Sequence, residues 1–361
     1  MEKEKKIEIQ TVIRIKDNLQ FLLFNNYIIS VIKTLNKEYE FHFYNKRNFK
    51  KEFILKIDKD EKEEDSNYEI FKLIHTKNKK IYLIGYQIFT AMYDGYKEKK
   101  LGLFKFEISR KKIEKIATYI YEDFYLDLKE DKIYISDDYS IITYDLLKDI
   151  SSKKEIEYRS NSCYLHWEKI FLIDNYFMFI SFREMAQYMF FLFGYIYDKN
   201  FEPLDKDLNN TGLKYIFPEW FEFRDYFFQI SDNYFLVNSF KFEQKIEIDI
   251  AEVRIKGNEN LIKSLNEEVE DLEKINVFKR HTIEIDEVGE LTLYPIDNER
   301  FGINISNRNI YIYKINGLEL IWKFNLNFNN NEKILLIAAK EKNEKYKLVL
   351  GNKNSILFLS S

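Results

Sequence analysis

The residues best suited to binding chemistry are lysines and arginines that gather in two stretches of the first third of the chain. Such a group can hold a phosphate backbone by charge and counterion release, without reading a base sequence. The candidate binding residues in these stretches are Lys46, Arg47, Lys50, Lys51, Lys99, Lys100, Arg110, Lys111 and Lys112. A second interpretation is that they are solvated turns, because lysine at strand ends also protects open sheet edges.

Aromatic side chains form a second candidate interface near the middle of the chain. The segment from Ile216 to Phe223 contains Phe217, Trp220 and Phe221. An exposed tryptophan buries a large area on binding and is a common interface anchor. The alternative is that these aromatic residues are ordinary inward-facing strand residues.

Catalytic and metal-binding patterns are weak in this sequence. The chain has no glycine-rich phosphate loop, no dinucleotide fingerprint and no nucleophile elbow. Cys163 and His166 have the spacing of half a zinc site, but a structural zinc needs four ligands and no second cysteine exists. The other histidines, His42, His75 and His281, lie far apart in sequence. We therefore expect no catalytic residue, no metal and no cofactor.

Paired carboxylates could serve a glycosidase, whose two carboxyl groups lie roughly 5 to 10 Å apart. The pairs are Asp123 with Asp127, Asp137 with Asp138, and Glu219 with Glu222. With 60 acidic residues in the chain, such pairs arise by chance. An enzyme that acts on a glycan or another small substrate remains an alternative hypothesis.

The charge is distributed unevenly along the chain. The net charge is −4, but residues 1–120 hold 26 Lys and Arg against 18 Asp and Glu, a net charge of +8. The remaining residues hold 30 basic and 42 acidic side chains, a net charge of −12. This asymmetry indicates an anionic partner for the N-terminal third.

A strand–turn–strand pattern recurs about every 40 to 60 residues and must position these groups. One copy runs from Asn309 to Asn325, where two alternating runs flank an Asn-Gly pair, a strong hairpin signal. Related copies lie at 39–55, 101–116, 140–158, 191–204, 248–265 and 355–361. The apolar runs predict strands that include Tyr27–Ile32, Leu101–Ile108, Tyr119–Asp127 and Lys132–Ser136. The stretches at 46–51 and 97–112 hold equivalent places in consecutive copies, so we expect them to lie side by side.

One repeat carries a resemblance to a known class. The segment Ile135–Leu146 resembles the last two strands of a WD-type repeat, with Tyr144 and Asp145 where Trp-Asp would stand. The Gly-His dipeptide of that repeat is absent, so the resemblance is to the β-propeller class and to no specific family. It implies a disc with a central channel and loop-lined faces that bind partners.

The predicted fold is all-β, a single β-propeller domain over residues 1–361 with seven four-stranded blades. Six or eight blades, or a stack of two β-sandwiches, are the alternatives. The strand Lys6–Ile15 is expected to close the ring against the C-terminal blade. Apolar residues at helical spacing predict one inserted amphipathic helix at 258–275.

Composition indicates a cytoplasmic protein without a membrane partner. The chain has one cysteine, and its first residues lack the apolar stretch of a signal peptide. Repeat architecture without a catalytic motif predicts a non-enzymatic interaction module with a protein partner. The alternative is a regulator or inhibitor of a nucleic-acid-handling complex that uses the basic N-terminal third, with nucleic acid or a nucleoprotein complex as partner.

Overall fold

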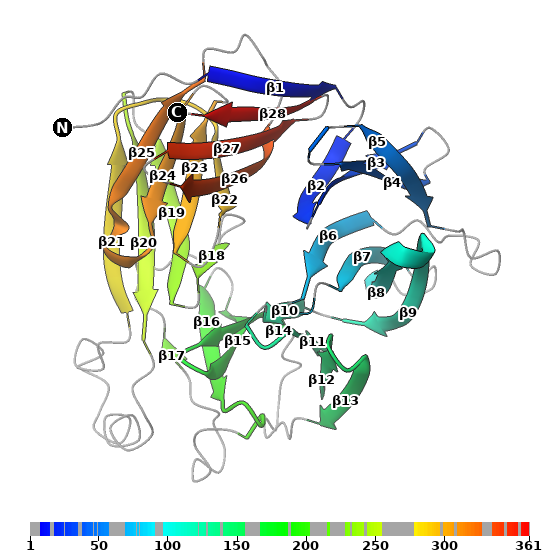
Figure 1. Ribbon diagram of the computed structural model, residues 1–361. Helices are drawn as coiled ribbons and strands as arrows, with labels where there is room; N and C mark the ends of the chain where they lie inside the picture. The colour runs from blue at the N-terminus through cyan, green and yellow to red at the C-terminus, as the bar shows by residue number, and fades with distance from the viewer. Residues whose placement is uncertain are drawn as a thin grey trace. The chain divides into compact units, whose positions relative to one another are not determined.

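The computed structural model of the chain consists almost entirely of β-strands that pair with strands close in sequence (Figure 1). The structure describes residues 8–14, 18–24, 26–34, 38–45, 47–48, 50–57, 69–76, 78, 80–90, 97–121, 123–127, 129–137, 140–155, 167–186, 189–202, 215–216, 228–231, 233–241, 244–254, 278–296, 299–306, 309–326, 334–342, 345–352 and 355–360. These residues include no α-helix. The helix predicted at 258–275 lies outside them.

The described strands form seven four-stranded antiparallel sheets in two compact units, residues 1–120 with 289–361 and residues 121–288. The first unit contains β2 (Asn18–Phe24), β3 (Tyr27–Lys33), β4 (Tyr39–Asn45) and β5 (Lys51–Lys56); β6 (Glu69–His75), β7 (Ile81–Thr90), β8 (Lys97–Glu107) and β9 (Lys112–Ile120); β22 (Leu291–Pro295), β23 (Arg300–Ile305), β24 (Asn309–Lys314) and β25 (Leu320–Asn325); and β1 (Glu8–Arg14) with β26 (Ile334–Lys342), β27 (Lys345–Asn352) and β28 (Ser355–Ser360). The second unit contains β10 (Asp123–Asp127), β11 (Lys132–Ser136), β12 (Ser140–Asp145) and β13 (Ile150–Glu155); β14 (Trp167–Ile173), β15 (Tyr176–Ala186), β16 (Met189–Tyr197) and β17 (Tyr215–Ile216); and β18 (Phe228–Ser231), β19 (Tyr234–Lys241), β20 (Ile246–Val253) and β21 (Phe278–Ile285).

Six sheets take their four strands in chain order, and the seventh has the order β1–β28–β27–β26. In that sheet, residues near both ends of the chain pair, with Glu8 opposite Ser360 and Arg14 opposite Ser355. Two expectations stay predictions: the number of blades in one ring, and a single domain that covers both units.

Burial changes from the inner to the outer strands of a sheet. The second strand β3 is buried over Ile28–Val31, whereas the fourth strands β5 and β13 are largely exposed. β-branched and aromatic residues suit a strand that is covered on both faces. The fourth strands instead carry lysine, glutamate and serine, which suits an open sheet edge.

The first strands of neighbouring sheets contact one another, as β2 does with β6 and β10 with β14. Side chains link these strands to the next backbone. Gln20 Oε1 accepts a hydrogen bond from Leu73 N at 3.2 Å, and Asp123 Oδ2 accepts one from Ile170 N at 2.9 Å. Such bonds satisfy backbone donors that the sheet ladder leaves free at a first strand.

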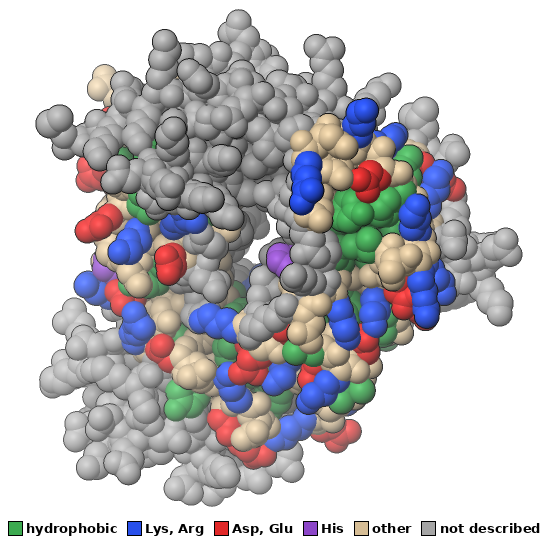
Figure 2. Space-filling model, viewed as in Figure 1, with side chains coloured by type: hydrophobic (Ala, Val, Ile, Leu, Met, Phe, Trp, Pro, Cys, Tyr) green, Lys and Arg blue, Asp and Glu red, His purple; other side chains and the backbone are tan. Residues whose placement is uncertain are grey.

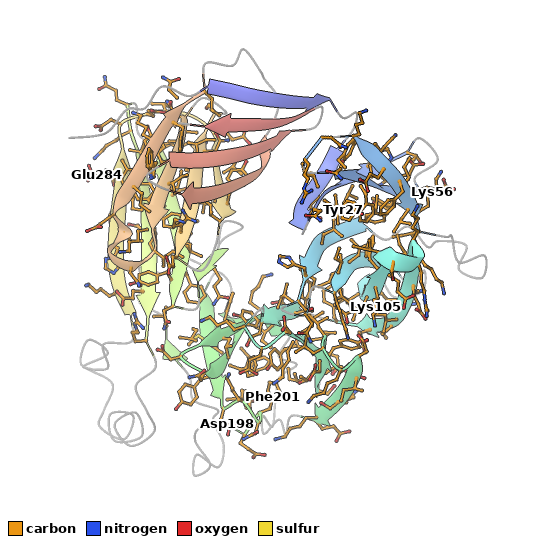
Figure 3. The ribbon with its side chains drawn as sticks, viewed as in Figure 1. Tyr27, Lys56, Lys105, Asp198, Phe201 and Glu284 are labelled. Carbon is orange, nitrogen blue, oxygen red and sulfur yellow. The ribbon has the colours of Figure 1, made fainter. Side chains whose placement is uncertain are left out.

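Two apolar clusters join adjacent sheets. One spans β2–β5 and β6–β9 and includes Phe41, Phe43 and Phe106. The other spans β10–β13 and β14–β17, where Phe201 of the turn after β16 stacks on Phe177 at 4.7 Å (Figure 3 labels Phe201 and Asp198). In both cases, the turn between the third and fourth strands of one sheet packs on the preceding sheet.

The structure corrects one predicted strand and confirms one predicted hairpin. The sequence predicts a single strand over Tyr119–Asp127, but β9 ends at Ile120 and β10 begins at Asp123, in a different sheet. The hairpin of β24 and β25 is present. Its turn places Gly317 at φ +82°, a conformation that glycine adopts readily.

Candidate functional site

The basic residues of the β4–β5 turn and the β8–β9 turn hold the same position in two neighbouring sheets, between the third and fourth strands. Arg47 and Lys50 lie in the first turn, and Lys51 begins β5. Arg110 and Lys111 lie in the second turn, and Lys112 begins β9. The turns are therefore equivalent, as the repeat predicted. Lys46 lies outside the described residues.

Lys99 and Lys100 do not belong to either turn. They lie inside β8, which begins at Lys97 because β7 extends far enough to pair Thr90 with Lys97. Lys100 is opposite Ile120, whereas Glu107 is opposite Lys112. Lys100 and Lys112 are thus at opposite ends of the β8–β9 hairpin, roughly 20 to 25 Å apart at about 3.3 Å per residue. The stretch at 97–112 therefore does not lie beside the stretch at 46–51 as a whole, because Lys99 and Lys100 are at the far end of the hairpin from the β8–β9 turn.

Asparagine side chains fix the backbone of the β4–β5 turn. Asn45 Oδ1 accepts a hydrogen bond from Arg47 N at 2.8 Å, and Asn48 Oδ1 accepts one from Lys50 N at 3.0 Å. Asn45 N also donates to Lys50 O at 2.9 Å across the turn. Bonds of this kind are the local turn chemistry of asparagine. The cations of this turn are therefore presented from an ordered backbone.

The β8–β9 turn is a short 3₁₀ turn over Ile108–Arg110 that ends at Lys111 in the left-handed conformation, with φ 50°. Lys111 N donates to Ile108 O at 3.1 Å and closes the turn. Arg110 pairs with Glu107 at 3.2 Å, so its charge is compensated within the turn.

An aromatic contact brings the two turns together. Lys111 Nζ lies 5.2 Å from the centroid of the Phe53 ring on β5, within the range of a cation–π interaction. Phe53 in turn stacks on Phe43 at 4.3 Å and meets the ring of Tyr27 edge-on at 5.7 Å. The half-buried Ile108 and Ile113 pack on the same cluster. The β8–β9 turn therefore rests against β5, directly after the β4–β5 turn.

The nearest acidic side chain on β5 is engaged elsewhere. Glu52 Oε1 accepts a hydrogen bond from Asn45 Nδ2 at 2.7 Å. Burial, and then the charge and hydrogen bond of Glu52, raise the pKa of Tyr27. Glu52 is thus held by Asn45 and Tyr27, not by a lysine.

We define the basic surface as Arg47, Lys50, Lys51, Lys111 and Lys112, all of which are exposed. Within the described part of the chain, no carboxylate forms an ion pair with any of these five side chains. Figure 2 shows Lys and Arg side chains along the outer margin of the β2–β5 and β6–β9 sheets. Five cations on two adjoining ordered turns leave a net positive field for an anionic partner.

The equivalent turns of the second unit are built differently, because their lysines are paired. In the β12–β13 turn, Lys148 Nζ lies 3.4 Å from Asp145 Oδ2. In the turn after β16, Lys199 pairs with Glu130. Hydrogen bonds from Lys132 and Lys199 lower the pKa of Glu130 from its ordinary value of 4.5 to about 2. The lysines Lys148 and Lys199 of these two turns are therefore compensated, whereas the five cations of the basic surface are not.

The two compact units also differ in total charge. Residues 1–120 with 289–361 hold 36 Lys and Arg against 25 Asp and Glu, a net charge of +11. Residues 121–288 hold 20 against 35, a net charge of −15. The basic surface thus belongs to a unit that is positive as a whole.

Several of the paired carboxylates have structural roles. Asp123 binds the Ile170 backbone, and Asp127 Oδ1 accepts hydrogen bonds from Lys129 N and Glu130 N in a turn. Asp137 Oδ1 accepts hydrogen bonds from the backbone and hydroxyl of Ser140 at 2.7 Å. Asp138, Glu219 and Glu222 lie outside the described residues.

Two histidines form pairs with glutamate on different sheets. His42 Nε2 lies 2.9 Å from Glu40 Oε2, and His281 Nε2 lies 2.9 Å from Glu252 Oε2. Among the described residues, no group of three or more His, Cys, Asp or Glu side chains could hold a metal ion. Cys163 and His166 lie outside these residues.

The second predicted interface is not described. Phe217, Trp220 and Phe221 lie outside the described residues. The described part of the chain contains no helix with the length and hydropathy needed to cross a lipid bilayer.

Sequence reasoning missed Asn45, Asn48 and Phe53, which hold the basic turns in place. The asparagines at the first and fourth positions of Asn45–Asn48 were a usable signal, since asparagine at turn starts bonds the backbone two residues on. The contact of Lys111 with Phe53 joins separate sheets, so no local pattern predicts it.

Comparison with known proteins gives the fold its context. No family model matches the chain, and no curated protein sequence matches it significantly. Among solved structures, Raptor of Chaetomium thermophilum matches with a TM-score of 0.51 and 10% identity over 96% of this chain. The chain spans 28% of the length of that Raptor chain.

The fold is a β-propeller. The propeller prediction made from the repeat is therefore confirmed. A second match is the β-propeller domain of Cps50 (Swd1) of Myceliophteria thermophila, with a TM-score of 0.46 and 10% identity over 97% of this chain and 99% of that one. A third is the C-terminal WD40 domain of Sif2, with a TM-score of 0.43 and 8% identity over 99% of each chain. The likeness to Raptor, at 10% identity, shows the fold alone.

Proposed function

We propose that this propeller is a non-enzymatic interaction module that docks a protein partner on the basic surface. The observation that carries the proposal is the contact of Lys111 with Phe53, which joins two equivalent basic turns into one surface. Propellers present binding sites on the turns between their strands. The turns here have ordered backbones, so little conformational entropy is lost when they bind.

A binding role also agrees with the described carboxylates. The carboxylates of Asp123, Asp127 and Asp137 accept hydrogen bonds from backbone N–H groups, which is a structural role. Two of the described histidines, His42 and His281, are likewise paired with glutamates along the sheets. These contacts support an interaction module over an enzyme. The argument that propellers bind proteins rests on the fold class, which is an analogy.

Site-specific photocrosslinking in the native cell tests the proposal. A photoreactive residue replaces the exposed Ser109, which lies in the β8–β9 turn between the basic residues. The matched control carries the same residue at Lys148, in the equivalent turn of the second unit. We expect protein adducts at position 109 that are absent at position 148. Equal adducts at both positions, or none at 109, would refute the proposal.

The same experiment tests the nucleic-acid alternative. The motivating observation is the group of five uncompensated cations, which suits any polyanion. Adducts at position 109 that disappear after nuclease treatment would favour nucleic acid over a protein partner.

We also propose that both compact units belong to one propeller domain over residues 1–361. The support is the order of the units along the sequence, because the chain leaves the first unit at Ile120, forms the second unit and re-enters the first at Gly289. Denaturant unfolding monitored by tryptophan fluorescence and by circular dichroism should then give coincident transitions. Two separated transitions would show that the units unfold independently.

A further inference from the structure

We infer that the partner segment on the basic surface is an extended, carboxylate-rich peptide, with aspartate and glutamate side chains spread over both turns. This inference rests on the proposed function and specifies the chemistry of its partner. The alternative class, single-stranded nucleic acid, is an outcome of the test.

The type of cation on this surface favours a partner with dispersed single charges. Four of the five residues are lysines, and Arg47 is the single arginine. A lysine ammonium is a compact point charge, whereas the planar fork of arginine binds one carboxylate or one phosphate through two hydrogen bonds. The one further arginine in these turns, Arg110, is already bound to Glu107. The surface therefore offers dispersed single charges, which match dispersed carboxylates.

The aromatic residues near the turns also argue against nucleic acid. Proteins that bind single strands stack bases on exposed aromatic rings. The ring of Phe53 is stacked on Phe43 on one side and approached by Lys111. Phe43 and Tyr44 are buried, with 0% and 8% of their surface exposed. Within the described part of these two turns, no aromatic ring is open for a base.

The charge of the whole chain limits the length of an anionic ligand. The basic surface lies on a unit of net charge +11, but the chain as a whole carries −4. A long polyanion is repelled by that negative total, whereas a short acidic segment meets only the local positive field. At an ionic strength of about 0.15 M, charges more than about 8 Å away are largely screened, so the five local cations dominate for a short peptide.

Both turns are needed to hold such a segment. Exposed ion pairs contribute only about 0.2 to 1 kcal/mol each, so no single lysine supports binding. The contact of Lys111 with Phe53 places Lys111 and Lys112 beside β5, which begins at Lys51. A segment that engages one turn is therefore close enough to reach the other.

The test measures fluorescence anisotropy of labelled probes with the full chain. The first probe is a peptide of about ten glutamates, roughly 33 Å long when extended. The second is a glutamine peptide of the same length, and the third is single-stranded DNA with the same number of charges. We expect the glutamate peptide to bind, the glutamine peptide not to bind, and the DNA to bind at least about tenfold more weakly.

Charge-matched variants then locate the binding. The test variant is K50Q/K51Q/K111Q/K112Q, and the control is K148Q/K153Q/K241Q/K279Q, which removes the same number of exposed lysines from the second unit. The test variant should weaken binding of the glutamate peptide by about tenfold or more, and the control by less than about twofold. The half variants K50Q/K51Q and K111Q/K112Q should each lose part of the affinity.

Three outcomes would overturn the inference: no binding of the glutamate peptide, equal loss in the test and control variants, or tighter binding of the DNA. Each is distinguishable from failure of the proposed function. Protein adducts at position 109 without binding of the glutamate peptide would leave the docking module intact and reject only the acidic segment.

Discussion

Asp123 Oδ2 accepts a hydrogen bond of 2.9 Å from the backbone N–H of Ile170, and so links the first strands of two adjacent sheets. The Asp123 side chain is 15% exposed, with Lys169 Nζ 3.6 Å from its other oxygen. Burial raises the pKa of this carboxyl above its ordinary value, against the opposing effects of Lys169 and the backbone donors. The carboxyl group that links the two strands therefore lies in a buried environment that disfavours its charged form.

Replacing Asp123 separates the hydrogen bond from the charge. Asp123→Asn keeps an oxygen acceptor for Ile170 N, whereas Asp123→Ala leaves that donor without a partner. We expect the alanine variant to lose about 1 to 3 kcal/mol of unfolding free energy and the asparagine variant to stay close to the parent. Urea unfolding at about pH 7 measures both.

The pH dependence of the same pair has a definite sign. Because the folded-state pKa of Asp123 is raised, the folded state binds this proton more tightly than the unfolded chain. The contribution of this carboxyl is most favourable below its unfolded pKa and is lost as pH rises through its folded pKa. Asp123→Asn should therefore gain stability relative to the parent as pH rises. A gain on acidification would contradict the raised pKa.

Glu130 should show the opposite behaviour. Its pKa is lowered to about 2 by Lys132 and Lys199, so its stabilisation is present above 4.5 and is lost as pH falls toward 2. Because all three side chains are partly exposed, we expect Glu130→Gln to cost about 1 kcal/mol at neutral pH. The stability difference from the parent, measured in urea across the acid range, should narrow below pH 4.5 and close as pH falls to about 2. A difference independent of pH would exclude the ion pairs as its cause.

Phe201 is the largest single packing contribution of the turn after β16. It is 7% exposed and contacts both Phe177 and Tyr134, which belong to neighbouring sheets. Phe201→Ala should lower the unfolding free energy by about 3 to 5 kcal/mol, from lost burial and a residual cavity. Phe201→Leu is the matched control and should cost much less. Similar losses in both would point to the ring contacts and not the volume.

Lys111 combines a strained backbone with a charge over Phe53. At φ 50°, glycine removes the strain that a lysine or alanine side chain retains. Lys111→Gly should have an unfolding free energy about 0.5 to 1 kcal/mol higher than Lys111→Ala. The shift of the thermal midpoint between the two variants measures this difference. Both variants should lower the affinity for the glutamate peptide equally, because both remove the same charge. An affinity that followed stability would assign Lys111 a purely structural role.

Strand positions could be predicted closely where polar breaks separate apolar runs. Lys132–Ser136 is predicted and observed with the same bounds, and the strand predicted at Tyr27–Ile32 is β3, one residue longer. The strand predicted to begin at Leu101 in fact begins at Lys97. The polar run Lys97–Lys100 has the composition of a turn, but it pairs with the end of β7 and so extends the strand.

The candidate site was predicted only in part for a related reason. Equivalence of the two basic turns follows from the repeat and could be read from the sequence. The identity of the compensated cations could not, since it depends on which carboxylate the fold brings near, as it brings Glu130 to the distant Lys199. Contacts between sheets are set by packing, and packing leaves no periodic trace in a single sequence.

The pairing of Arg14 with Ser355 has a consequence for biosynthesis. β1 is translated before every other described strand, and the residue that pairs with Arg14 follows 341 residues later. At about 5 to 20 residues per second, the wait is roughly 20 to 70 s. During that interval the earliest strand has no ladder to join, and its exposed backbone depends on chaperones or on its own charges for protection. The order of synthesis thus makes the sheet that joins both ends the last to assemble.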